Sequence, residues 1–277
     1  MGDELFRIKY LQETFEYAAE AVDSIGTDAL PKMLARICEN LSAYDSLIIY
    51  AFVKDEIPRL LFDDLSEWHQ KKKVSQYFEG AYLLDPFYDL YRQRVRDGLY
   101  HLASIAPADF IESEYFNTFY KETRLIDEVS IIVNIRPDTQ LHLSLGLRDS
   151  KRTLTPEDIS RLEVVTPLLI ALTRSHWPDV SGETSHVGAH MENAFNQFGS
   201  SRLSERESEI ARLVLMGHSS KSMARLLNIS PETVKVYRKK VHQKLEISSQ
   251  GELFSIFLEG LKKMPVGQHG DPLNFIR

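Results

Sequence analysis

Basic side chains are concentrated on one predicted helix in the C-terminal quarter of the chain. The helix opens at Ser230-Pro231-Glu232-Thr233 and carries Lys235, Arg238, Lys239, Lys240 and Lys244. Proline fits the first position of a helix, and Ser230 is a suitable N-cap. Backbone N–H groups at a helix N-terminus can receive a phosphate, and short polar or basic side chains can contact phosphates and base edges. This chemistry is that of nucleic-acid recognition.

Three other predicted helices position the basic helix. Ser204-Glu205-Arg206-Glu207 and Ser249-Gln250-Gly251-Glu252 each have the capping-box pattern and open a helix. Ser219 caps a short helix that ends at Asn228-Ile229, directly before the basic helix. Two short helices joined by a tight turn form a helix-turn-helix, whose second helix enters the major groove. We therefore predict an all-α, four-helix domain over residues 202–265.

Charge is distributed unevenly along the chain. Residues 203–263 contain 11 Lys and Arg against 7 Asp and Glu, a net charge of +4, whereas the 277-residue chain carries −7. The remainder therefore carries −11. This distribution indicates that the C-terminal part alone contacts phosphate.

The C-terminal motifs resemble those of LuxR-type regulators over about 60 residues without a gap. The resemblance rests on Leu203-Ser204-Glu205-Arg206-Glu207, on the run from Gly217 to Ala224, on the run from Ile229 to Lys235, and on Lys244-Leu245. Three positions depart from the family pattern: Tyr237 replaces the usual histidine, Lys240 the usual asparagine and Gln250 the usual arginine. The departures leave the expected fold intact and bear on the individual DNA contacts.

The resemblance implies a homodimer that binds double-stranded DNA at a two-fold symmetric operator. Together with the helix caps, it gives the following expected DNA-binding residues: Ser219, Lys221, Ser230, Thr233, Lys235, Arg238 and Lys239. It further implies that the fourth helix helps to pair the two subunits through Leu253, Ile256 and Phe257.

The N-terminal part alternates between helical and strand patterns, so the chain is predicted to be α+β. Strands are expected over residues 47–53, 59–62, 129–135 and 141–147, the last two as a hairpin across Arg136-Pro137-Asp138-Thr139. Helices are expected over residues 5–25, 28–41, 66–83, 85–96, 109–123 and 155–176. The expected architecture is an α-β-α sandwich with an antiparallel sheet over residues 1–176. A linker over 177–201 with one short helix (191–198) and a tail over 266–277 complete the chain.

Aromatic residues and one aspartate suggest a ligand site in this N-terminal domain. The candidates are Trp68, Tyr77, Tyr82 and Asp85, the last within Asp85-Pro86. The order of elements resembles the autoinducer-binding domain of quorum-sensing regulators and, more loosely, a GAF-type domain. The Trp-to-Tyr spacing is longer than the autoinducer-binding pattern, and Asp127-Glu128 replaces its usual glycine. An acyl-homoserine lactone-like compound and an amine or amino-acid metabolite are both open as ligands, because aromatic walls and one carboxylate suit either.

Structural roles compete with this interpretation. Asp85 could be the N-cap of a helix that begins at Pro86, and the aromatic residues could be core. The function expected from the whole chain is ligand-responsive transcription regulation, and the alternative is a regulator that is ligand-independent or controlled by a protein partner.

Other function classes lack their sequence signals. A phosphoacceptor receiver would need a parallel α/β pattern with acidic residues at its strand ends. The lone Cys38 lies in a helical pattern, His186 and His190 have no third ligand nearby, and there is no phosphate-binding loop. We therefore expect no catalytic residue, metal or cofactor. With one cysteine and no long apolar run, we expect a cytoplasmic protein without membrane contact.

Overall fold

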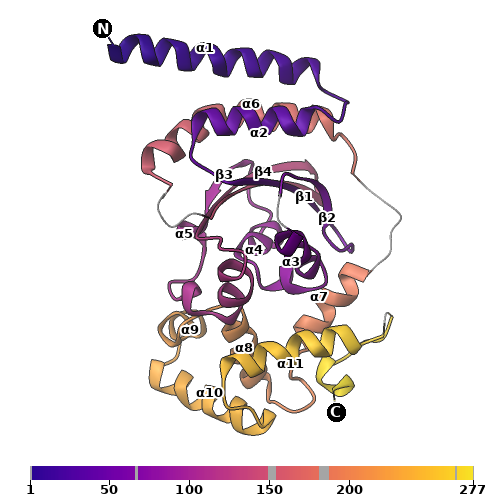
Figure 1. The fold of residues 1–277 in the computed structure, drawn as a ribbon. Coiled ribbons are helices and arrows are strands. Elements are labelled where there is room, and N and C mark those ends of the chain that lie inside the picture. Colours follow the sequence, from indigo (N-terminus) through magenta and orange to yellow (C-terminus); the bar gives the residue numbers. More distant parts are fainter. Residues whose placement is uncertain (1, 66–67, 149–153, 181–186, 266, 277) are drawn as a thin grey trace.

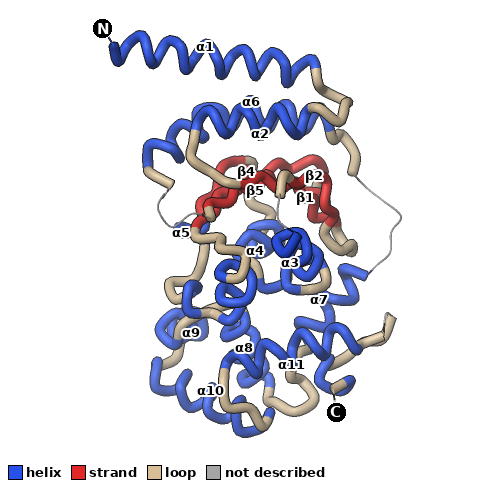
Figure 2. Tube along the Cα trace, in the orientation of Figure 1, coloured by secondary structure: helices blue, strands red, loops and turns tan. Residues whose placement is uncertain are grey.

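An antiparallel sheet lies between two layers of helices, and a further group of helices packs against one of these layers (Figure 1). The computed structural model describes residues 2–65, 68–148, 154–180, 187–265 and 267–276. Among these residues, no helix has the length and apolar character needed to cross a membrane. Figure 2 shows the strands confined to the N-terminal part, with helices above and below them. The expected α+β class and α-β-α sandwich are confirmed.

The sheet has five strands in the order β2-β1-β5-β4-β3, each antiparallel to its neighbours. The strands are β1 (Ser46–Val53), β2 (Arg59–Asp63), β3 (Gly98–His101), β4 (Asp127–Arg136) and β5 (Thr139–Leu147). The predicted hairpin is confirmed, because β4 and β5 pair directly. Strand β3 was missed: it has four residues, all half-buried, and so carries no alternating pattern.

Side chains alternate between the two faces of the sheet, and this alternation separates two environments. On β5, Leu141, Leu143 and Leu145 belong to the core beneath the first helical layer. The residues between them, His142 and Ser144, lie on the opposite face and are also buried. The second face is therefore partly polar although it is covered by helices.

The first helical layer contains α1 (Gly2–Asp23), α2 (Leu30–Leu41) and α6 (Pro156–His176). Helix α6 begins at the predicted N-cap Thr155, which forms a capping box with Asp158. Helices α2 and α6 lie over the sheet, and α1 lies outside them (Figure 1).

The second layer is made of short pieces: α3 (Trp68–Phe78), η1 (Ala81–Leu84), α4 (Pro86–Arg92), α5 (Leu102–Ile105), η2 (Phe110–Glu112) and the π-helix η3 (Phe116–Lys121). Three expected helices are thus corrected. The one expected over 66–83 breaks at Gly80, whose φ of 140° suits glycine alone. The one expected over 85–96 ends at Arg92. The one expected over 109–123 is a 3₁₀ turn followed by a π-helix.

The C-terminal helices are α7 (Val187–Gln197), α8 (Glu205–Leu215), α9 (Ser220–Leu227), α10 (Pro231–Leu245) and α11 (Gln250–Lys263), followed by η4 (Pro272–Phe275). The predicted N-caps Ser204, Ser219, Ser230 and Ser249 each accept a hydrogen bond from the third residue of their helix. Helix α7 begins earlier than the short helix expected in the linker. We refer to α8–α11 as the DNA-binding module.

The C-terminal tail is anchored to the segment that precedes the module. The carboxylate of Asp271, 2% exposed, accepts hydrogen bonds from the backbone N–H groups of Gly199 (3.0 Å) and Ser201 (2.8 Å) and from the Ser201 hydroxyl (2.6 Å). Buried hydrogen bonds to a charged group stabilise a fold appreciably, and their donors are costly to leave unpaired. The tail is therefore a structural part of this end of the protein.

Asp271→Ala should lower the free energy of unfolding by about 3 kcal/mol, because several buried donors lose a charged acceptor. Urea denaturation of the full chain would measure this loss. Asn274→Ala, at an exposed position of the same tail, is the matched control. Equal midpoints for the two variants would show that the hydrogen bonds of Asp271 contribute nothing to stability.

Candidate functional site

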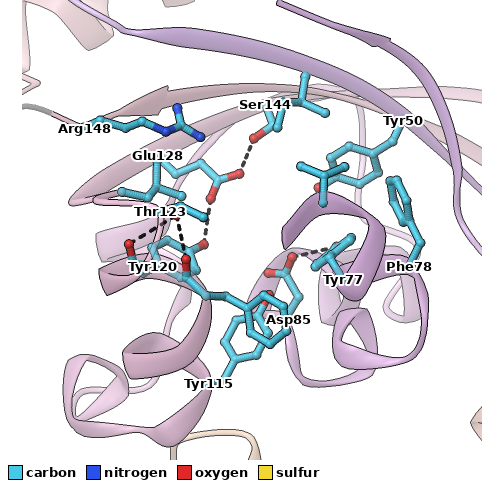
Figure 3. Close-up of a pocket in the computed structure, with 14 residues that line it drawn as sticks. Tyr50, Tyr77, Phe78, Asp85, Tyr115, Tyr120, Thr123, Glu128, Ser144 and Arg148 are labelled. Carbon is cyan, nitrogen blue, oxygen red and sulfur yellow. Dashed lines mark hydrogen bonds between the residues drawn. The ribbon is translucent and has the colours of Figure 1, made fainter. Parts of the chain in front are cut away.

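A cavity of about 90 Å³ lies between the polar face of the sheet and the second helical layer. Six of its fourteen lining residues are aromatic: Tyr50, Tyr77, Phe78, Tyr115, Phe119 and Tyr120. Two carboxylates, those of Asp85 and Glu128, face into it from opposite sides (Figure 3). Such a mixture of apolar wall and few polar groups is typical of small-molecule sites.

Asp85 both caps α4 and lines the cavity. Its Oδ1 accepts the backbone N–H of Phe87 at 2.9 Å, and its Oδ2 accepts the hydroxyl of Tyr77 at 2.7 Å. Burial, followed by the negative charge of Glu128, raises the pKa of Asp85 to about 7, against the lowering effect of these hydrogen bonds. The structural and ligand-site interpretations of Asp85 are therefore compatible.

Glu128 supplies the second carboxylate from β4. It accepts hydrogen bonds from the Tyr120 hydroxyl, at 2.7 Å, and from the Ser144 hydroxyl on β5 (Figure 3). Burial raises the pKa of Glu128, and the positive charge of Arg148 opposes this rise. The sequence analysis noted Glu128 only as a departure from a family glycine. Strand alternation could have found it, because Glu128 and Ser130 flank the core residue Val129.

The structure brings two of the four predicted ligand residues to the cavity. Tyr77 and Asp85 line it and are hydrogen-bonded to each other. Tyr82 is buried against Phe52 and Tyr88 and is not part of the wall. Trp68 begins α3, but its side chain lies outside the described part of the chain.

The DNA-binding module presents a helix-turn-helix made of α9 and α10. Asn228 ends α9 in the left-handed conformation, with φ of 53°, and Ser230 caps α10 two residues later. This tight connection sets α10 across the end of α9, as a recognition helix requires. The carboxylate of Glu207 on α8, which is buried, accepts a hydrogen bond from Lys244 at 2.6 Å and so fastens α10 to α8.

Most predicted DNA-contact residues lie on the exposed surface of this motif. The side chains of Lys221, Lys235 and Lys239 are exposed. Arg238 is half-buried and donates hydrogen bonds to Ser220 and to Gln250. Ser219, Ser230 and Thr233 are at the N-termini of α9 and α10, where backbone N–H groups are available to phosphates.

Residues 201–257 match the family model described as bacterial regulatory proteins, luxR family. An HTH-type transcriptional regulator in the exeN 3′ region of Aeromonas salmonicida is 32% identical over 197 residues, which are 68% of this chain and all of that protein. The chain belongs to the LuxR family. It is a DNA-binding transcriptional regulator.

Further similarities concern separate parts of this LuxR-family chain. The transcriptional regulatory protein TdiR of Thauera aromatica is 43% identical over 58 residues, 21% of this chain and 26% of that protein. The crystal structure of the VqsR LBD domain from Pseudomonas aeruginosa has a TM-score of 0.52 and 28% identity. The match covers 58% of this chain and 94% of that one. The N-terminal α-β-α sandwich of this chain is thus similar in fold to the VqsR LBD domain.

The LuxR-family module is docked against the second helical layer of the N-terminal domain. A Cβ atom on Gly217 would lie 3.0 Å from Cβ of Ser113, and one on Gly251 would lie 3.3 Å from the carboxyl carbon of Glu114. The rings of Phe119 and Phe254 are 6.5 Å apart across the same boundary. One continuous apolar core runs from the sheet into the module.

A charged cleft of about 500 Å³ accompanies this docking. The N-terminal domain contributes Asp109 and Glu112 to it, and the module contributes Lys221, Lys235 and Arg238. Part of the predicted DNA-contact surface therefore faces carboxylates of the same chain. DNA phosphates are also negatively charged, so Asp109 and Glu112 would repel them from this part of the DNA-contact surface.

The structure corrects the expected pairing surface on α11. Leu253 and Phe257 are fully buried within the chain, and Phe257 packs on Phe195 and Phe198. Neither side chain is available to a second subunit in this arrangement. Ile256 is partly exposed and is the residue of the predicted set that stays accessible.

Proposed function

We propose that this regulator is controlled by a small effector molecule, whose binding in the cavity sets the position of the DNA-binding module. The observation that carries the proposal is that one aromatic segment belongs both to the cavity wall and to the contact with the DNA-binding module. Phe119 lines the cavity and also packs on Phe254 of the module. A π-helix, which is common at functional sites, holds this part of the segment. An effector that displaces Phe119 would thus alter the docking contact directly.

The likeness to the LBD, or ligand-binding, domain of VqsR supports a sensing role for the cavity. In this proposal the docked arrangement is the form with low DNA affinity, because Asp109 and Glu112 face the basic residues. Effector binding shifts the population toward an undocked form. The effector is either acyl-homoserine lactone-like or an amine or amino-acid metabolite.

The undocked form would act as a homodimer on a two-fold symmetric operator in the cytoplasm. Its proposed DNA contacts are Ser219, Lys221, Ser230, Thr233, Lys235, Arg238 and Lys239. A dimer reads two half-sites that follow its own symmetry. This role requires no catalysis, metal or cofactor.

Gly251→Leu tests the proposed control. Leucine fits the first turn of α11, but its Cβ atom would already lie 3.3 Å from the Glu114 carboxyl carbon, so the rest of the side chain must displace Glu114 and weaken the docked contact. We expect the variant to bind the operator about tenfold more tightly than wild type without any effector, a change of about 1.4 kcal/mol. Fluorescence anisotropy with an operator duplex selected from random sequence would measure it.

Ser255→Leu is the matched control, because it adds the same side chain one turn later at an exposed position. It should leave operator affinity unchanged. If Gly251→Leu and Ser255→Leu bind the operator equally, the docked contact does not restrain DNA binding and this route of control is wrong.

A further inference from the structure

We infer that the cavity selects a small organic cation, an ammonium compound held by the carboxylate of Asp85. The inference rests on the proposed function and names the chemical class of its effector. It distinguishes between the two classes that the sequence leaves open, the lactones and the amines.

The two carboxylates of the cavity differ in whether a positively charged side chain lies beside them. Figure 3 places Arg148 beside Glu128 and away from Asp85. Accordingly, the charge of Arg148 acts on the pKa of Glu128. The hydrogen-bond donors to Asp85 are neutral groups, namely the Tyr77 hydroxyl, the Phe87 N–H and the Tyr115 hydroxyl. A buried charge is costly without a counter-charge, so a ligand that brings a positive charge to Asp85 gains most.

The wall next to Asp85 suits an ammonium group and a short alkyl chain. The rings of Tyr50, Tyr77 and Phe78 pack edge to face, with centroids 5.2 to 6.2 Å apart. Aromatic faces attract cations, and more strongly where water is excluded. Ile48 and Val74 add aliphatic wall against which methylene groups can pack.

The size of the cavity favours a small molecule. Its volume of about 90 Å³ gives room for several water-sized atoms, at roughly 10–15 Å³ each. A short alkylammonium fits this space, whereas a long acyl chain exceeds its volume. An anion would add a third negative charge beside Asp85 and Glu128.

The proton and the cation compete for Asp85. Burial raises the pKa of this carboxyl to about 7, so below that pH an ammonium must displace a proton. Ligand affinity should therefore rise about tenfold per pH unit below 7 and level off above it. The ionisable and charged groups that face Asp85 or line the same cavity are Tyr50, Tyr77, Tyr115, Tyr120, Glu128 and Arg148.

The test uses three probes of equal chain length that differ in charge: n-butylammonium, n-butanol and n-butyrate. Each is titrated into the full chain by calorimetry at pH 8 and pH 6, with N-butanoyl homoserine lactone as a fourth probe. Asp85→Asn removes the charge and keeps an acceptor for the Phe87 N–H. Asp89→Asn, on the next turn of α4 and outside the cavity wall, is the matched control.

We expect n-butylammonium to bind at least about tenfold more tightly than the other probes at pH 8 and to weaken at pH 6. Asp85→Asn should abolish this preference and Asp89→Asn should keep it. Equal binding of n-butanol, no binding of n-butylammonium, or full binding by Asp85→Asn would each overturn the inference.

The proposed function fails separately from this inference. If the lactone binds and changes operator affinity while n-butylammonium does not bind, the cation inference is wrong and effector control stands. If n-butylammonium binds as expected but leaves operator affinity unchanged, the cation site stands and effector control by this ligand is wrong.

Discussion

Asp85→Asn should unfold at a higher temperature than wild type at pH 8, and the gain should vanish near pH 4. The folded protein holds the pKa of this carboxyl at about 7, against an ordinary value of 3.8. Between these values the folded state binds more protons than the unfolded state. Wild-type stability therefore falls as the pH rises from about 4 to about 7.

Asparagine does not titrate, so the variant escapes this loss. The shift of about three pKa units corresponds to about 4 kcal/mol above pH 7, as an upper bound. Asparagine also keeps an oxygen that can cap α4, whereas alanine would lose the cap. The comparison is therefore between side chains of the same shape.

Thermal and urea unfolding of both proteins at pH 4, 6 and 8 would measure this effect. Glu122→Gln removes an exposed carboxylate from the same domain and serves as the control. A constant difference between Asp85→Asn and wild type at all three pH values would show that Asp85 is not held protonated by its surroundings.

A variant that combines Lys235→Ala with Arg238→Ala should bind its operator about 100-fold more weakly than wild type. Each lost contact to phosphate or base removes about 1–3 kcal/mol of binding free energy. The dependence of affinity on salt should also become less steep, because fewer counterions are released from the DNA. Anisotropy titrations at two salt concentrations would measure both quantities.

Lys263→Ala removes a positive charge from the far end of α11, where Lys263 is paired with Glu259 within one helix. It should leave operator affinity near the wild-type value, and urea denaturation should show that every variant is folded under the conditions of the binding assay. If the double variant binds as tightly as Lys263→Ala, α10 is not the recognition helix.

The helices of the DNA-binding module were predicted closely because the sequence signals that mark them are local. Each helix begins at a serine that caps it, and such a cap depends on residues three positions apart. The same locality explains why the hairpin of β4 and β5 was predicted. The polar turn between them separates two runs of strand-forming residues.

The cavity was predicted only in part because it depends on packing between distant segments. Tyr77 and Asp85 are close in sequence and were found together. Glu128 lines the same cavity as Tyr77 and Asp85 only because β4 of the folded sheet lies opposite α3 and η1. Its hydrogen-bond partner Tyr120 belongs to a π-helix, which the periodicity of hydrophobic residues does not predict.

The pairing residues show the limit of arguing from resemblance. Leu253 and Phe257 were expected at a subunit interface, yet both are fully buried within the chain. Apolar residues spaced three to four positions apart indicate an apolar helix face, but this spacing does not identify the segment or subunit that covers the face. Here the chain's own residues, Phe195 and Phe198 among them, cover Phe257.

The most direct test of effector control is the operator affinity of the full chain with and without saturating n-butylammonium or N-butanoyl homoserine lactone. The same samples give the affinity of the ligand with and without operator. Effector control predicts that at least one ligand changes operator affinity about fivefold or more, and that operator changes the affinity for that ligand by the same factor. Effector control would be contradicted by a ligand that binds wild type but not Asp85→Asn, and so occupies the cavity, yet leaves operator affinity unchanged.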